Sequence, residues 1–198
     1  MLKAISFISQ AAPVLIIFVY IFALYSYVAN GAKTKSFLKI CAAALLLLYP
    51  LVAILETYAQ YNVWLNDAVS KNFLPPVTPI TYFLQYSFTH FWLGRLIGIT
   101  LAVLFYFFLH LLAKRRPWLF AEGETELGLV CALIAGWPGF VLFLPLIFIV
   151  ALPLTIFRQL VLKQERTTLG GAFLLAAGVS LVFGSWAIEV LRLGVLRI

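Results

Sequence analysis

Three glutamates, Glu122, Glu124 and Glu126, stand at alternate positions just before a long apolar stretch. Ionisable side chains at membrane depth are costly to bury and are often functional. Helical spacing places Glu122 and Glu126 on one face and Glu124 nearly opposite. The cluster is therefore a candidate polar site. It has a second interpretation, as first-turn acids that complement a helix dipole and the basic residues at 114–116.

Arg95, Glu56 and Glu189 form a second candidate polar site, because all three could lie near the other end of a helix bundle. An ion pair between Arg95 and either glutamate would lower the cost of burial and hold two helices together. A polar site for a lipid or a peptide segment is the alternative interpretation.

The remaining reactive side chains do not point to a cofactor or a metal. His90 and His110 stand 20 residues apart on one expected helix, which is about 30 Å at the helical rise, so they cannot ligate one haem iron. Cys41 and Cys131 lie in separate apolar runs without metal-ligand spacing. Nucleophile elbows, zinc-protease motifs, phosphate loops and dinucleotide fingerprints do not occur in the sequence. We therefore expect no cofactor and no metal site.

The composition indicates an integral membrane protein. Of 198 residues, 64% are hydrophobic and only 11% are charged, whereas a soluble domain carries about 25% charged residues. Such a chain cannot cover itself with polar side chains, so membrane lipids are its first expected partner. The formal charge of +7 could suggest nucleic acid, but the positions of the basic residues favour a signal for membrane topology and exclude nucleic acid as a partner.

We predict an all-α, polytopic membrane protein that forms one transmembrane domain over residues 1–198. A span needs about 20 mostly apolar residues. Six expected spans lie at about 11–29, 38–57, 91–112, 124–137, 140–157 and 169–190. Between the second and third spans, residues 58–90 are rich in Tyr, Asn and Pro, so this segment is expected to lie along the membrane interface, with a short helix near 81–88.

The orientation follows from the distribution of basic residues, since cytoplasmic loops carry an excess of Lys and Arg. Nine of the fourteen would lie on one side of six spans: Lys33, Lys35, Lys39, Lys114, Arg115, Arg116, Arg158, Lys163 and Arg166. That side is predicted to be cytoplasmic, which places both termini on the non-cytoplasmic side.

The segment Phe120-Ala121-Glu122-Gly123-Glu124-Thr125-Glu126, which runs into Ala135-Gly136-Trp137-Pro138, resembles the GxGDxK segment of prepilin and preflagellin peptidases. In that family the motif follows a basic loop and opens an apolar helix that ends in a Gly-Trp turn. The last span of the family begins with a Pro-Phe-Gly-Pro-Phe-like segment, and Thr168-Leu169-Gly170-Gly171-Ala172-Phe173 stands in the matching place. The resemblance covers about residues 94–184.

The resemblance implies an aspartic endopeptidase of a bacterial or archaeal cytoplasmic membrane, which cuts the leader from pilin-like precursors. Two Asp carboxylates share a water, one as acid and one as base. In this chain Glu124 matches the motif aspartate and is the candidate catalytic residue, while Ala121 and Glu126 replace the motif glycine and lysine. The second aspartate belongs in the first span, where Ile21 or a neighbour takes its place and no acid occurs.

Asp67 is the single aspartate of the chain. The predicted topology places it across the membrane from Glu124, so the two carboxyl groups could not share a water. We interpret Asp67 as a solvated loop acid.

Three functional hypotheses remain open. The first is a catalytically inactive relative of the prepilin peptidases that binds a pilin-like or other single-span membrane protein as a scaffold or subunit. The second is an active endopeptidase that uses Glu124 with another acid. The third is a small carrier or lipid-handling protein, which would need a polar path inside the bundle.

Overall fold

A computed structural model of the chain describes residues 2–30, 35–117, 120–160 and 169–190. Within these ranges the chain is helical with short turns and contains no strand, which confirms the all-α prediction. The helices are α1 (Leu2–Asn30), α2 (Lys35–Asn66), α3 (Ile80–Ser87), α4 (Leu93–Arg115), α5 (Glu124–Leu160) and α6 (Gly170–Val190). A 3-10 turn at Ser70–Phe73 precedes α3, and a π-helical turn at Phe88–Trp92 joins α3 to α4.

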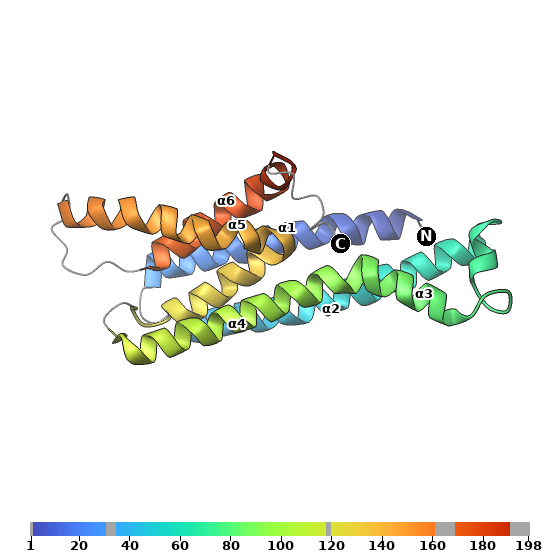
Figure 1. Ribbon diagram of the computed structural model, residues 1–198, viewed down its shortest axis with the longest axis horizontal. Coiled ribbons are helices and arrows are strands. Elements are labelled where there is room, and N and C mark those ends of the chain that lie inside the picture. The colour runs from blue at the N-terminus through green and yellow to red at the C-terminus, as the bar shows by residue number, and fades with distance from the viewer. Residues whose placement is uncertain (1, 31–34, 118–119, 161–168, 191–198) are drawn as a thin grey trace.

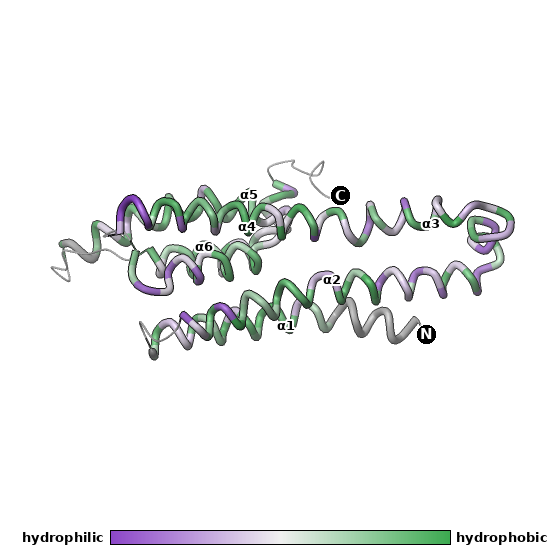
Figure 2. Tube along the Cα trace, turned by 90° about the horizontal axis from the view of Figure 1, so that it is seen from below, coloured by the Kyte–Doolittle hydropathy of each residue, from purple (hydrophilic) through white to green (hydrophobic). Residues whose placement is uncertain are grey.

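Four helical stretches of the described chain are long and apolar enough to cross a membrane: Ala11–Ala29, Lys35–Asn66, Ile80–Arg115 and Glu124–Phe157. The bundle that they form is green along most of its length in Figure 2, because apolar side chains cover the outside as well as the core. Phe18, Leu47 and Phe148 are more than half exposed. Such surfaces suit contact with lipid, so the chain is a multi-pass membrane protein.

The second helix is longer than its predicted span, since α2 continues past 57 to Asn66. Neither Gly nor Pro occurs after Pro50 in this helix to stop it. It ends beside Asp67, whose carboxylate Oδ2 accepts a hydrogen bond from the backbone N–H of Ser70 at 2.8 Å. This bond holds the pKa of the Asp67 carboxyl below its usual range.

The outer part of α2 and the α3 segment form a hairpin that extends beyond the other helices, at the right of Figure 1. It has its own small core of Trp64, Leu74 and Phe83. The rings of Trp64 and Phe83 pack edge to face with centroids 5.2 Å apart. The predicted short helix near 81–88 is present as α3, whereas an interfacial position for residues 58–90 stays a prediction.

Helix α5 is broken at Gly136 and Trp137. Gly136 has φ 54° and ψ −175°, and Trp137 is extended, so neither residue is helical. Proline at 138 leaves the carbonyl of residue 134 without its i+4 N–H donor. Beyond the break the chain doubles back, as the orange half of α5 shows in Figure 1. This reversal lies at the turn predicted for Pro138 and Gly139.

Two glycines of α4, one turn apart, bring that helix against the break. A Cβ at Gly94 would meet the Trp137 ring at 3.5 Å, and one at Gly98 would meet the Trp137 backbone nitrogen at 3.0 Å. Small residues four apart allow this approach in membrane helices.

We expect Gly98→Ala to push α4 away from the break and to destabilise the protein by about 1–3 kcal/mol, as overpacking does elsewhere. Thermal unfolding of the detergent-solubilised protein would measure the loss. Gly184→Ala is the matched control, because its added Cβ would find only an ordinary contact at 3.9 Å, with Ser180 Oγ. Equal unfolding temperatures for the two variants would contradict the close approach.

Candidate functional site

Glu124 is the first residue of α5 and is completely buried. Its carboxylate accepts four hydrogen bonds, two at each oxygen. Oε1 accepts from the Tyr27 hydroxyl at 3.1 Å and from the backbone N–H of Gly170 at 2.7 Å. Oε2 accepts from the backbone N–H groups of Ala121 at 2.9 Å and Leu169 at 3.3 Å. A carboxylate has about four acceptor positions, so this one is saturated.

The four donors come from separate parts of the chain. Tyr27 lies in the last turns of α1, Ala121 precedes α5, and Leu169 and Gly170 open α6. The N–H groups at a helix start lack partners within the helix and carry a partial positive charge. Glu124 supplies the negative charge for two helix starts at once, those of α5 and α6.

Two glycines make room for this arrangement. Gly123 has φ +84°, the left-handed conformation that glycine adopts without strain. A Cβ at Gly170 would lie 2.3 Å from the Tyr27 hydroxyl and 2.8 Å from Glu124 Oε1. Residue 170 therefore must lack a side chain for the three groups to meet.

The other two glutamates of the cluster face elsewhere. Glu126 is buried, lies 3.9 Å from Lys35 Nζ and accepts a hydrogen bond from the Thr125 hydroxyl at 2.8 Å. Glu122 is exposed. Both line a cavity of about 370 Å³ together with His110 and Lys114. The structure thus separates Glu124, which points into the helix contact, from Glu122 and Glu126, which point into a cavity of mixed charge.

Within the described part of the chain, the hydrogen bonds of Glu124 do not include another carboxyl group. Helix α1, from which the resemblance expects an aspartate, contributes the Tyr27 hydroxyl instead. Ile21, at the expected place of that aspartate, is 54% exposed. Asp67 lies at the hairpin tip, at the far end of α2 from Lys35.

The predicted ion pair of Arg95 forms with Glu56, with 2.8 Å between Arg95 Nη1 and Glu56 Oε2. The same Nη1 group donates to the carbonyl oxygen of Phe91. A second bond between these two helical segments runs from Trp92 Nε1 to the Thr57 hydroxyl at 3.1 Å. Glu189 lies near the end of α6.

No group of three His, Cys, Asp or Glu side chains among the described residues could hold a metal ion. His90 lies in the π-helical turn and stacks on Tyr86 with ring centroids 4.1 Å apart. His110 lies in α4. Cys41 and Cys131 are buried and are not linked to each other.

Sequence reasoning missed the partners of Glu124. Tyr27 is 97 residues away in the chain, and the other three donors are backbone groups that have no residue type of their own. A signal was present in Leu169 and Gly170, which belong to the segment compared with the start of the last span in the peptidase family.

Comparison of the chain with protein-family models, with curated proteins and with solved structures gave no match. The resemblance to prepilin peptidases therefore depends on the motif residues given above.

We expect Gly170→Ala to unfold the protein at a lower temperature than Gly184→Ala, because its methyl group occupies the place of the Tyr27 hydroxyl. A buried polar group that loses its partner costs about 1–3 kcal/mol, whereas alanine in a helix is otherwise preferred to glycine by about 1 kcal/mol. Thermal unfolding in detergent would compare them. A Gly170→Ala protein as stable as the control would contradict the contact.

Proposed function

We propose that this protein is a membrane scaffold that resembles the membrane domain of prepilin peptidases, lacks peptidase activity and binds the helix of a single-span membrane protein. The saturated carboxylate of Glu124 carries this proposal. An aspartic dyad works only when two carboxyl groups can hold one water between them. Glu124 has no acceptor position left for that water, because three backbone N–H groups and a phenol use all four.

The second carboxyl group that an aspartic dyad needs is also missing from the hydrogen bonds of Glu124 to the described residues. The resemblance expects an acid from the first span, but α1 presents Tyr27, whose hydroxyl donates to Glu124. A phenol that donates a hydrogen bond to a carboxylate is not a second carboxyl group, and it does not supply the other half of an aspartic dyad. Glu124 is also one methylene longer than the motif aspartate, and a catalytic carboxylate must be held within about 0.5 Å of its working position.

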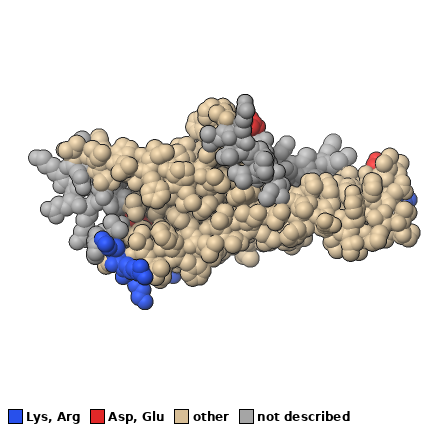
Figure 3. Space-filling model, viewed as in Figure 1, with Lys and Arg blue, Asp and Glu red and all other residues tan. Residues whose placement is uncertain are grey.

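Distances along two helices support a position across the membrane for both. Lys35 and Glu56 are 21 residues apart in α2, and Arg95 and Arg115 are 20 apart in α4. At 1.5 Å per residue both separations are about 30 Å, the thickness of the hydrocarbon core. The Glu56–Arg95 ion pair then lies at one membrane surface. The ends of α2 and α4 that carry Lys35 and Arg115, called the basic end here, lie at the other. Figure 3 shows Lys and Arg side chains gathered at that end.

In this orientation the basic end is cytoplasmic and contains Glu124 and the mixed-charge cavity. The chain crosses the membrane six times, with the halves of α5 on each side of Gly136 as the fourth and fifth spans. Because α1 starts and α6 ends far from Glu124, both termini lie on the non-cytoplasmic side. The hairpin of α2 and α3 lies on the same side as the termini.

The cavity beside Glu126 is the proposed binding site for the partner. Its lining contains Lys35 and Lys114 as well as Glu122 and Glu126. Groups of both signs at the membrane surface suit the charged junction where a single apolar helix enters the cytoplasm. A pilin-like precursor has the chemistry for such a site, with its helix in the lipid and its leader junction in the cavity.

The experiment combines purified protein with a pilin-like precursor that carries a photo-crosslinker at the junction of its leader and its apolar helix. We expect crosslinks near the cavity and an uncleaved precursor. Lys114→Glu should reduce crosslinking several-fold, because it reverses a charge in the cavity, and Lys71→Glu at the hairpin tip should leave it unchanged.

Two outcomes would contradict the proposal. Cleavage by the parent protein that disappears in Glu124→Gln would establish the peptidase hypothesis. Crosslinking that is absent, or that is equal in Lys114→Glu and the parent, would remove the assigned binding site.

A further inference from the structure

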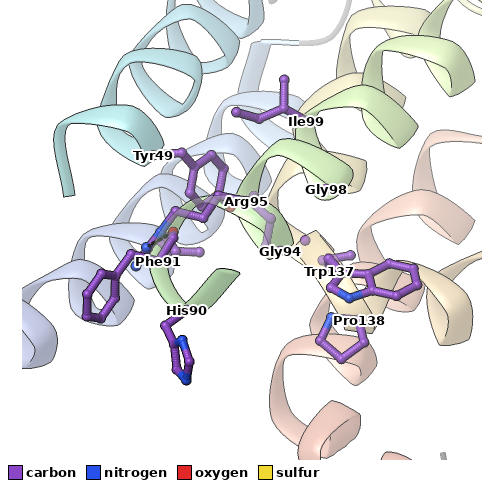
Figure 4. A pocket seen from close by; sticks show the side chains of 13 residues that line it. Tyr49, His90, Phe91, Gly94, Arg95, Gly98, Ile99, Trp137 and Pro138 are labelled. Carbon is purple, nitrogen blue, oxygen red and sulfur yellow. Dashed lines mark hydrogen bonds between the residues drawn. The ribbon is translucent and has the colours of Figure 1, made fainter. Parts of the chain in front are cut away.

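The Glu56–Arg95 ion pair borders a cavity that the proposed scaffold function does not use. Arg95, Tyr49, His90 and Trp137 line a space of about 410 Å³. In Figure 4, Arg95 and His90 lie on one side of it and Trp137 and Pro138 on the other. A smaller adjoining space of about 250 Å³ is lined by both Glu56 and Arg95.

An apolar cleft adjoins this polar cavity. It has a volume of about 390 Å³, and Pro13, Ile17, Gly184 and Ile188 are among its lining residues. Ile16 of α1 lines all three spaces, and Trp137 lines both the polar cavity and the apolar cleft. The three spaces therefore adjoin one another around Ile16, and together they make a groove that is charged at one end and apolar at the other.

Both members of the ion pair keep unused hydrogen-bonding groups. Their contact uses one nitrogen of Arg95 and one oxygen of Glu56, and their side chains are 26% and 15% exposed. Within the part of the chain that the structure describes, Arg95 Nη2 and Nε and the second oxygen of Glu56 make no hydrogen bond to a residue outside the pair. The pair thus presents a donor group and an acceptor group, side by side, to a ligand.

We infer that this groove binds one phospholipid with a phosphoethanolamine headgroup. The phosphate accepts hydrogen bonds from Arg95, and the primary ammonium donates to Glu56. A neutral ion pair complements a zwitterion, whereas a purely anionic headgroup would bring a second negative charge beside Glu56. The acyl chains occupy the apolar cleft next to Ile16.

The position of Arg95 across the membrane matches the level at which lipid headgroups lie. Arg95 lies about 30 Å along α4 from the basic end, which is one hydrocarbon thickness. Trp92 and Trp137 lie at the same level, close to Arg95 and Gly94 in the structure, and tryptophan favours the membrane–water interface. A lipid of the outer leaflet would reach the ion pair with its phosphate and ammonium groups.

The test measures lipid retention by native mass spectrometry, and unfolding temperature, for the purified full chain in detergent. The probes are phosphatidylethanolamine, phosphatidylcholine, phosphatidylglycerol and water-soluble phosphoethanolamine. Phosphatidylethanolamine should be retained about tenfold more than phosphatidylcholine, because the choline group cannot donate hydrogen bonds to Glu56. Of the four probes, only phosphatidylethanolamine should raise the unfolding temperature of the protein.

Substitutions at Ile16 and Arg95, with a control at Ile21, locate the binding. Ile16→Trp fills the point where the three spaces meet and should abolish retention, while Ile21→Trp, at an exposed position of the same helix, should leave it unchanged. Arg95→Lys keeps a positive partner for Glu56 but removes the forked donor, and should reduce retention several-fold. If Ile16→Trp does not fold, Ile16→Phe fills the same point with a smaller ring.

Several results would overturn the inference. Equal retention of the ethanolamine and choline lipids would remove the role of Glu56. A preference for phosphatidylglycerol would assign an anion site, and equal binding of soluble phosphoethanolamine would assign a site without acyl chains. Unchanged retention in both Ile16 variants would place the lipid elsewhere. Because the test uses neither a precursor nor the Glu126 cavity, its failure leaves the scaffold proposal untouched.

Discussion

The rest of the structure depends on one buried carboxylate. Glu124 receives a phenol from α1, a loop N–H from before α5 and two N–H groups from the start of α6, so one residue fixes three helix ends. Taking a charge into a protein interior is costly unless hydrogen bonds replace those of water. Here the four donors replace them. If one of the three helix ends moved, Glu124 would lose a hydrogen bond, so each helix end depends on the position of the other two.

Tyrosines and glycines extend this constraint along the bundle. Tyr20, two turns before Tyr27 in α1, donates to the carbonyl oxygen of Leu174 in α6 at 3.0 Å, and a Cβ at Gly178 would lie 2.5 Å from its hydroxyl. Tyr49 of α2 donates to the carbonyl oxygen of Leu133, in the last turn before the break in α5. Each phenol donates to a backbone carbonyl group of another helix in a mostly apolar bundle, so it ties the two helices together. Helix α1 is thereby held at more than one depth.

The sequence predicted the helical class and the polar residues better than their partners. Apolar runs of sufficient length located the helices, and the scarcity of acids singled out Glu124 and the Glu56–Arg95 pair. The last part of α2 was not predicted, because residues 58–66 are only moderately apolar and their helix is stabilised by packing of Trp64 on α3. The donors to Glu124 were not predictable, because backbone N–H groups are the same in every residue and Tyr27 is distant in sequence.

The central claim is that Glu124 holds the fold together and performs no chemistry. The most direct measurement compares the thermal unfolding of Glu124→Gln with that of Glu122→Gln in detergent. Glutamine at 124 would turn an amide donor toward groups that are themselves donors, so we expect a loss of about 1–3 kcal/mol for each buried donor that is left without an acceptor. The exposed glutamine at 122 should change stability by less than about 0.5 kcal/mol. A Glu124→Gln protein as stable as the parent would contradict the claim.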